Sequence, residues 1–375
     1  MGILEKAEKA IFSKQDLTPA QTVVQQVCKI KKGETLVIAA NPETAGIAQE
    51  LYSAAIETGA KPVLIYQPKK TAMDLAEPAV IGALKSEPKV FFSISAGKLG
   101  KDAEAREKPY TDEKGQKFDH IFDYLLDGKK TMRAVWTPGL TPDMFNRTVN
   151  IDYKLLAERC DILCKKYENA GTVHVTAPNG TDVTVTIKDR KGLLDNGDFS
   201  VPGSGGNIPA GEVFISPVVG QTEGTVVFDG SMSFSDGDSI LKTPITCKIE
   251  KGFITSITGG EEAKRLLKDI TAAEKEALAL EKSGKLPAGQ GEVYKRNARN
   301  IGELGIGLNP SACITGNMLE DEKAFRTCHF AVGMNYDGDA PCLIHFDGVV
   351  RDPTIVIKYL DGTECTVLEN GELCF

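Results

Sequence analysis

Residues 34–67, "ETLVIAANPETAGIAQELYSAAIETGAKPVLIYQ", hold two short apolar runs with a helix-like stretch between them. The runs "ETLVIAA" (34–40) and "KPVLIYQ" (61–67) each predict a buried strand. Residues 44–58 predict a helix, and Gly59 follows as a stop signal. A strand, a helix and a strand in this order predict two parallel strands joined by a right-handed crossover.

The same theme continues toward residue 170. The runs "KVFFSISA" (89–96) and "MRAVWTP" (132–138) predict two more strands, and residues 153–168 predict a long helix. Strands that alternate with helices are typical of α/β proteins. We therefore expect an α/β N-terminal domain with a mostly parallel sheet.

Beyond residue 170 the pattern becomes one of β-hairpins. The stretch "TVHVTAPNGTDVTVTIKDR" (172–190) alternates apolar and polar residues across Asn179-Gly180, a strong hairpin signal. Residues 223–230, 247–259 and 354–373 have a similar texture. One helix is expected at residues 261–282, with Gly284 after it and an apolar stripe of Leu266, Leu267, Ile270, Ala273, Ala277 and Leu278. We expect a domain boundary near residue 170, with an α/β domain at 1–170 and a β-rich α+β catalytic domain at 171–375.

Composition and charge exclude several function classes. The chain has 375 residues, of which 41% are hydrophobic and 26% charged, as in globular proteins. A net charge of −8 argues against a nucleic-acid or anionic-membrane partner. No apolar run approaches the roughly 18 residues that cross a bilayer, and "MGILEKAEKAIFSKQ" carries charges where a signal peptide is apolar. We expect a cytoplasmic protein with reduced cysteines.

Two of the four histidines lie in one segment, "TCHFAVGMNYDGDAPCLIHFDG" (327–348). If "CLIHFDG" is a strand, His345 and Asp347 project from the same face. Together with His329 they would offer a nitrogen and oxygen ligand set that suits Zn²⁺, Mn²⁺, Co²⁺ or Fe²⁺. The other interpretation is ordinary core or surface histidines beside an incidental aspartate. The residues alone leave both open.

Two glutamates favour the metal site. Glu212 lies in "GGNIPAGEVFISP" (205–217) and Glu303 in "NIGELGIGLNP" (300–310), each after a glycine and before apolar residues. Such neighbours predict a closely packed environment. A buried carboxylate needs a cation or a hydrogen-bond network, because an unpaired charge is costly away from water. Two glutamates near the histidines and Asp347 could bridge two metal ions.

Four motifs in this order resemble the aminopeptidase T and aminopeptidase S family of metallo-aminopeptidases: "GNIPAGEVFISP", "NIGELGIGLNP", "LEDEKAFRTCHFAVGMNY" and "IHFDGVV". The similarity extends over nearly the whole chain. The resemblance implies two divalent ions (Zn, Co or Mn), a homodimer that encloses the active sites, and short peptide substrates. The ligands it implies are Glu212, Glu303, His329, Tyr336, His345 and Asp347.

The roles that the resemblance implies for Glu322 and for the ligand Tyr336 need separate comment. Glu322 matches an acidic position that would orient a histidine ligand. Tyr336 is the least evident ligand, because a phenol has a pKa near 10 and binds as phenolate only when a metal lowers that pKa. Without the resemblance, the ordinary interpretation of Tyr336 is a buried core tyrosine.

The leading hypothesis is thus a two-metal aminopeptidase that removes N-terminal residues from short peptides. One metal would anchor the free α-amino group, and both would hold a bridging water as the catalytic group. A nearby carboxylate would pass a proton to the leaving amine. The presence of Glu212 and Glu303 beside the histidines favours two metals, since a single iron needs only three protein ligands.

Two departures support an alternative. Lys323 stands where the aminopeptidases usually have asparagine, and the stretch between His329 and His345 is short. These features resemble a neighbouring branch that includes a non-haem iron enzyme opening the ring of 2,5-dihydroxypyridine. Its single iron would be held here by His329, His345 and Asp347, a 2-His-1-carboxylate arrangement. A binding protein with a structural metal is disfavoured, because structural sites are usually closed and rich in cysteine.

Overall fold

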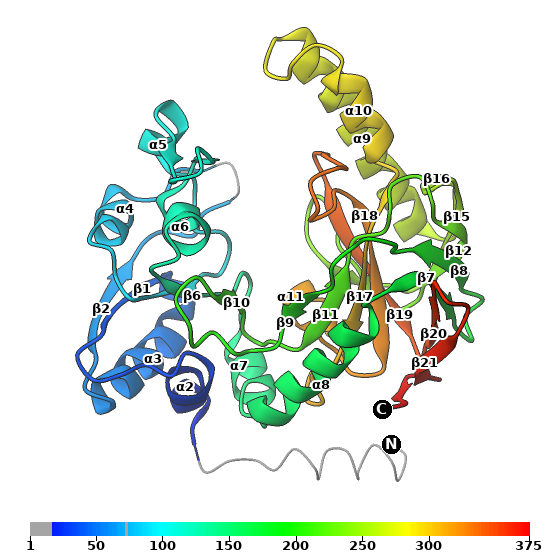
Figure 1. Cartoon of the computed structure of the whole chain (residues 1–375). Helices are drawn as coiled ribbons and strands as arrows, with labels where there is room; N and C mark the ends of the chain where they lie inside the picture. The colour runs from blue at the N-terminus through cyan, green and yellow to red at the C-terminus, as the bar shows by residue number, and fades with distance from the viewer. Residues whose placement is uncertain (1–16, 72–73) are drawn as a thin grey trace. The chain divides into compact units, whose positions relative to one another are not determined.

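A computed structural model describes residues 17–71 and 74–375 (Figure 1). The chain divides into two compact units. The first contains Met1–Ala157 and Asp195–Ala210, and the second contains Glu158–Leu194 and Gly211–Phe375. This division differs from a single boundary near residue 170, because residues 195–210 return to the first unit.

The first unit contains a five-stranded parallel sheet in the order β10-β6-β3-β1-β2. Strand β3 is buried at every position, and β1 at every position after Thr35. Continuous burial is typical of parallel strands that are covered on both faces. The structure therefore confirms the predicted α/β domain. The strands are β1 (Thr35–Ala40), β2 (Lys61–Tyr66), β3 (Val90–Ile94), β6 (Arg133–Trp136) and β10 (Gly205–Asn207).

Helix α3 (Ala45–Glu57) connects β1 to β2, as predicted. Its buried residues Ile47, Leu51, Ala54 and Ala55 repeat at helical spacing and form one face. Gly59 follows with φ 79°, a conformation that glycine adopts without steric cost. The other elements before the second unit's sheets are α2 (Pro19–Thr22), η1 (Val23–Val27), η2 (Pro42–Thr44), α4 (Pro78–Lys85), α5 (Ala103–Glu107), β4 (Tyr110–Thr111), β5 (Lys117–Phe118), α6 (Ile121–Asp123), η3 (Tyr124–Gly128), α7 (Pro142–Thr148) and α8 (Tyr153–Lys166).

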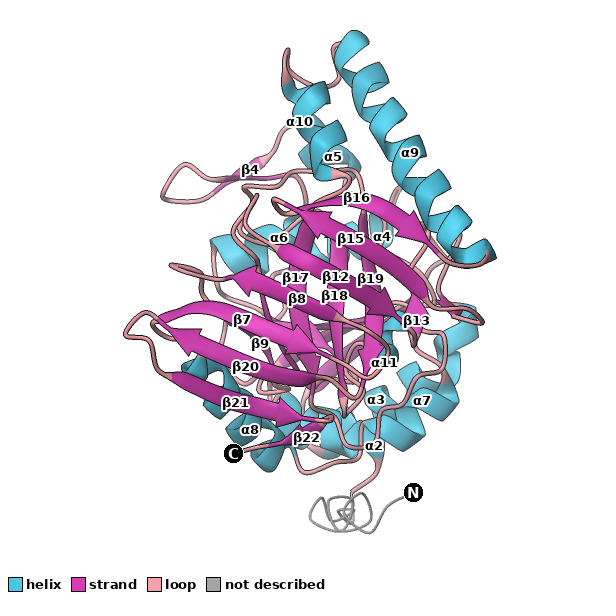
Figure 2. Cartoon of the chain, turned by 90° about the vertical axis from the view of Figure 1, so that its right-hand side faces the viewer, coloured by secondary structure: helices cyan, strands magenta, loops and turns pink. Residues whose placement is uncertain are grey.

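The second unit is built on two β-sheets, as expected for the β-rich part. An eight-stranded antiparallel sheet has the order β16-β15-β12-β8-β7-β20-β21-β22, and a seven-stranded sheet has the order β14-β13-β19-β18-β17-β11-β9. In Figure 2, β17, β18 and β19 lie behind the eight-stranded sheet. The strands of the larger sheet are β7 (Ala170–Thr176), β8 (Asp182–Thr186), β12 (Glu223–Phe228), β15 (Ile245–Glu250), β16 (Phe253–Thr258), β20 (Thr354–Tyr359), β21 (Glu364–Glu369) and β22 (Glu372–Leu373).

The smaller sheet carries most of the residues that were singled out in the sequence. Its strands β14, β13, β19, β18, β17 and β11 pair in an antiparallel manner. The seven strands of this sheet are β9 (Leu193–Asp195), β11 (Glu212–Ile215), β13 (Ser231–Met232), β14 (Ser239–Ile240), β17 (Ile301–Gly307), β18 (Thr327–Gly333) and β19 (His345–Arg351). Strands β17 and β18 are buried along their whole length.

Two local predictions for this unit can be compared with the structure. The hairpin is confirmed, because β7 and β8 pair across Asn179-Gly180. Helix α9 (Glu261–Lys282) also has the predicted bounds; α10 (Gln290–Asn297) and α11 (Met318–Asp321) follow it. Part of the predicted apolar stripe on α9 is wrong, because Leu267 is 40% exposed and Leu278 36% exposed. Leu267 follows the buried Leu266, and Leu278 follows the buried Ala277. One residue turns the side chain by about 100° around the helix axis, which directs both leucines away from the buried face.

Within residues 17–71 and 74–375, no helix is long and apolar enough to cross a membrane. The expectation about a signal peptide rests on residues 1–15, which lie outside the described residues.

Candidate metal centre

Four neighbouring strands of the seven-stranded sheet carry the predicted ligands. Glu212 begins β11, Glu303 lies on β17, His329 lies on β18, and His345 and Asp347 lie on β19. The strand register places Ala331 opposite both Glu303 and Asp347. Residues that lie opposite one another in a sheet share a face, so these side chains project from the same side.

Small residues stand between the ionisable ones on that face. Gly305 pairs with His329, Gly307 with Glu212, and Gly333 with His345. Because none of these glycines has a side chain, the longer side chains opposite them can fold over the strand and converge. The small residues therefore leave space on this face of the sheet for the longer side chains.

The side chains do converge. The Nε2 atom of His329 lies 3.0 Å from a carboxylate oxygen of Glu303 and 3.4 Å from one of Glu212. The Nε2 atom of His345 lies 3.3 Å from Asp347 and 3.6 Å from Glu303. Glu303 thus stands between the two imidazoles.

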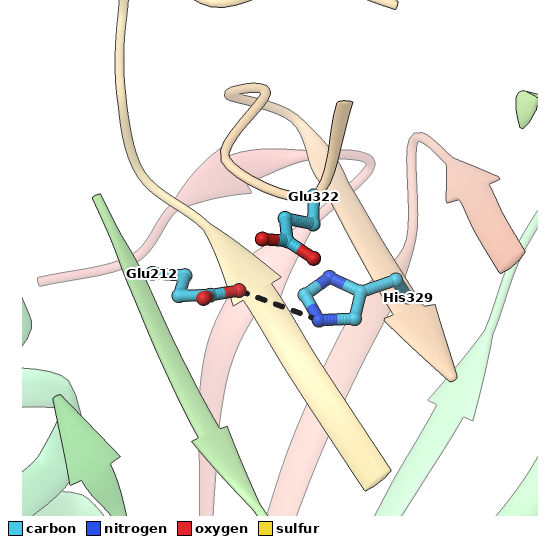
Figure 3. Close-up of side chains that lie close together, drawn as sticks. All are labelled: Glu212, Glu322 and His329. Atoms are coloured by element: carbon cyan, nitrogen blue, oxygen red, sulfur yellow. Dashed lines mark ion pairs between the residues drawn. The ribbon is translucent and has the colours of Figure 1, made fainter. Parts of the chain in front are cut away.

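Two overlapping groups of side chains offer ligand atoms within 4.8 Å of one another. One contains Glu303, His329 and Asp347, and the other contains Glu212, Glu322 and His329. Figure 3 shows Glu212 and Glu322 directed toward the His329 ring from different sides. The structure thus brings both predicted glutamates, both histidines and the aspartate into one cluster.

Several buried atoms of this cluster lack a hydrogen-bond partner among the described residues. They are Oε2 of Glu212, Oε2 of Glu303, Nδ1 of His329 and Oδ1 of Asp347. Buried polar atoms nearly always have a partner in native proteins. Three carboxylate oxygens in this condition, next to imidazole nitrogens, fit the ligand set of a divalent cation.

The hydrogen bond of His345 fixes which nitrogen can bind a metal. Its Nδ1 lies 2.9 Å from the carbonyl oxygen of Met334. A carbonyl can only accept, so Nδ1 carries the hydrogen and donates it. The neutral ring then has its lone pair on Nε2, which faces Asp347 and Glu303. A hydrogen bond of this kind is typical of histidines that bind metals.

The carboxylates strongly affect the two imidazoles. Burial by itself lowers the pKa of His329, but Glu303 and Glu212 outweigh that effect and raise the pKa to about 9. Burial also lowers the pKa of His345, and Asp347 and Glu303 raise it to about 10. Each histidine therefore holds a proton near neutral pH when no metal is bound.

The pKa values of the four carboxyl groups in the cluster are also shifted, three upward and one downward. Burial is the main cause that raises the pKa of Glu212, Glu303 and Glu322 above the usual range. Burial also acts to raise the pKa of Asp347, but His345 outweighs it and lowers that pKa to about 2. Burial thus disfavours the charged form of the three glutamates, and a cation beside them would offset this cost.

Tyr336 is placed differently from the other predicted ligands. The residue is 54% exposed, so the ordinary interpretation as a buried core tyrosine is wrong. Its ring packs edge to face against the rings of His345 and Phe214, with 5.3 Å between ring centres in each pair. A role for the phenol oxygen as a ligand stays a prediction.

Lys323 belongs to the same cluster, although the sequence marked it only as a departure from a motif. Its side chain is fully buried, and its Nζ lies 2.8 Å from a carboxylate oxygen of Glu212 and also contacts Glu322. A sequence of three acidic residues followed by a lysine is typical of a solvated surface segment. The adjoining apolar residues Ala324 and Phe325 were the only local signal of burial. The predicted role of Glu322 in orienting a histidine stays a prediction.

Gly305 is a second functional position that the sequence did not reveal. A Cβ atom built on Gly305 would lie 2.0 Å from Nε2 of His329. The imidazole therefore rests directly on the backbone of β17. A sequence pattern that could have indicated this close packing is "GELGIG", in which every second residue after Glu303 is glycine.

A family model agrees with this region of the chain. The model of the NicX family, described as 2,5-dihydroxypyridine 5,6-dioxygenase, matches residues 141–374. A 2,5-dihydroxypyridine 5,6-dioxygenase of Pseudomonas putida is 32% identical to the chain over 99 residues. That alignment covers 26% of this chain and 28% of the Pseudomonas protein, well under two thirds of its length.

Two solved structures resemble the whole fold. The structure of 2,5-dihydroxypyridine dioxygenase from Pseudomonas putida has a TM-score of 0.67 and 19% identity, and the alignment covers 96% of this chain and 97% of that one. Wild-type AmpT from Thermus thermophilus has a TM-score of 0.64 and 16% identity, with 95% and 98% covered. At these identities, both likenesses show the fold alone.

Substitution of Gly305 tests how closely the imidazole is packed. We expect Gly305→Ala to displace His329 and to weaken the binding of a divalent cation by roughly 10- to 100-fold, the usual cost of a misplaced ligand. Gly82→Ala is the control, because Gly82 is exposed in α4 and nothing lies within 4 Å of an added Cβ. Calorimetric titration measures both affinities. Wild-type affinity in Gly305→Ala would contradict the placement of His329.

Metal binding should also release protons. With pKa values of about 9 and about 10, both histidines are protonated in the metal-free protein at about pH 7. A metal binds only neutral imidazole, so we expect release of about two protons per chain, and fewer as the pH rises through these pKa values. Calorimetry in buffers of different ionisation enthalpy counts the protons. A heat of binding that does not depend on the buffer would refute this assignment.

Proposed function

The chain belongs to the 2,5-dihydroxypyridine 5,6-dioxygenase family, and on that basis we propose that it is a metal-dependent dioxygenase that opens the ring of a dihydroxypyridine. Its membership corrects the predicted aminopeptidase T and S family, and the predicted aminopeptidase activity and hydrolase class are wrong. The likeness to AmpT does not support an aminopeptidase activity, because at 16% identity it shows the fold alone. A peptide substrate depended on that activity and is not proposed.

The predicted alternative function is the one that the family supports. A dioxygenase family implies a metal, and the cluster on β11, β17, β18 and β19 contains groups that could hold one. Two ions of zinc, cobalt or manganese have no support from the family. We propose a single Fe(II) ion instead, held by His329, His345 and Asp347, with open positions for substrate and oxygen.

The residues of the cluster fit that single ion. The buried atoms that lack hydrogen-bond partners include Nδ1 of His329 and Oδ1 of Asp347, and the bond to Met334 directs Nε2 of His345 into the cluster. Glu303 also groups with His329 and Asp347. When bound, an Fe(II) ion supplies the one-electron chemistry that lets dioxygen react with an aromatic ring.

Glu303 is suited to accept a proton from a substrate hydroxyl. It is buried, its pKa is raised by that burial, and it lies beside both imidazoles. A carboxylate with a raised pKa takes up a proton more readily near neutral pH than a solvated one does. We assign Glu303 the role of general base.

The rings next to the cluster are suited to hold a flat substrate. Phe214 and Tyr336 contact each other, and Tyr336 also contacts His345. Aromatic rings favour offset or edge-to-face contacts with another ring. Because Tyr336 is half exposed, it offers such a contact at the solvent side of the metal ligands. Cytoplasmic location and a homodimer remain predictions.

The observation that carries this proposal is that Asp347 groups with His329 and pairs with His345, in a chain of this family. The test begins with anaerobic loading of the metal-free protein with Fe(II). Oxygen uptake is then measured with 2,5-dihydroxypyridine, and release of p-nitroaniline with leucine p-nitroanilide. We expect oxygen uptake in proportion to substrate and no release of the amine.

Single substitutions link that activity to the proposed ligands. We expect His345→Ala to lower oxygen uptake by roughly 100-fold or more and to lower the iron content, because a ligand is lost. His174→Ala is a matched control: His174 pairs with Asp182 at 2.8 Å but lies at the surface on β7. Elemental analysis and an oxygen electrode give both readouts. Equal activity in the two variants would refute the ligand assignment.

A further inference from the structure

Lys323 is a cation buried among the carboxylates of the metal centre. None of its surface is exposed, and it is among the largest fully buried side chains of the described residues. Lysine is almost never fully buried unless its charge is paired. Its ammonium contacts Glu212, with a distance of 2.8 Å, and Glu322.

The backbone around Lys323 holds this side chain in place. Its N–H donates to the carbonyl of Glu320 at 2.9 Å, and its carbonyl accepts from the N–H of Asn309, also at 2.9 Å. The first bond lies at the end of α11, and the second links the segment to residues just beyond β17. Lys323 is therefore fixed from both sides, and its position does not depend on a flexible loop.

The two preceding acidic residues are directed elsewhere. Glu320 accepts the backbone N–H of Cys313, and Asp321 accepts those of Thr315 and Gly316. Both carboxylates are buried and are bound to the 313–316 segment. The third of these acidic residues, Glu322, contacts the ammonium of Lys323.

These contacts overlap with one of the two groups that could hold a metal. Glu212, Glu322 and His329 form that group, and two of the three contact Lys323. The other group contains Glu303, His329 and Asp347, and its two carboxylates form ion pairs with His329 and His345. The cluster therefore contains two overlapping groups of ligand atoms, and one of them faces an ammonium that the chain supplies itself.

We propose that the Lys323 ammonium takes the place of a second metal ion and so restricts the centre to one metal per chain. This inference rests on the proposed single-metal function. Like charges at a few ångströms repel strongly where water is scarce, so a divalent ion does not bind to Glu212 and Glu322 beside the ammonium. The metal binds on the side of Asp347, in the group that Glu303 and His329 complete.

The test counts metal ions in variants of the full chain. Metal-free wild type, Lys323→Ala and Lys323→Arg are dialysed against Zn²⁺, and elemental analysis gives the ions bound per chain. We expect one ion in wild type and in Lys323→Arg, which retains the charge. We expect two in Lys323→Ala, since the freed carboxylates then need a cation. Loading with Co²⁺ should show a second absorbing site in that variant alone.

A second variant allows for a folding defect. Loss of the ammonium removes a charged partner from Glu212 and from Glu322, which destabilises the fold. Lys323→Asn keeps a donor for one of them, and we expect it also to bind two ions. If either variant is unfolded without metal, refolding with one or two equivalents of Zn²⁺ answers the same question. Recovery of the fold should require the second equivalent.

The outcomes separate this inference from the proposed function. Folded Lys323→Ala and Lys323→Asn that bind one ion would overturn the role of Lys323 and leave the single-iron function intact. Two ions in wild type would overturn both. One ion in wild type and two in Lys323→Ala, without oxygen uptake, would refute the dioxygenase function but support the role of Lys323.

Discussion

The compensation of buried negative charge is the constraint on which this centre depends. Glu212, Glu303, Glu322 and Asp347 converge on one side of the seven-stranded sheet, where water is scarce. Such a group is unstable without cations, and removal of one partner from a buried ion pair costs about 3–5 kcal/mol. Lys323 provides positive charge from within the chain, together with two protonated imidazoles in the metal-free protein or with a metal ion bound to the neutral imidazoles. The fold and the metal site are therefore energetically linked.

The sheet makes this arrangement possible because antiparallel pairing sets which residues lie opposite one another, with one register shift between Ile301 and Glu303. The imidazole of His329 packs on the backbone of Gly305, and Ala331 lies opposite both Glu303 and Asp347. Small residues at these points leave the volume that the ligands fill. A polar cluster on a sheet face needs such gaps, since strand spacing does not otherwise admit several long side chains at one point.

The wrong prediction of an aminopeptidase has a physical explanation. Two histidines, one aspartate and nearby glutamates occur in both kinds of centre, so residue types along the chain do not separate peptide hydrolysis from oxygen chemistry. The presence of Glu212 favoured two metals. The structure shows that Glu212 contacts Lys323, so the carboxylate has a partner within the chain.

Local sequence patterns were enough to predict the strand–helix–strand unit at 34–67, the hairpin at Asn179-Gly180, helix α9 and most residues of the candidate metal centre. These features depend on local periodicity, turn chemistry and residue type, which can be read along the chain. Only the tertiary structure decided that Lys323 is buried, that Gly305 supports His329, and that residues 195–210 return to the first unit. Each of these depends on contacts between residues distant in sequence, and such contacts leave no periodic pattern.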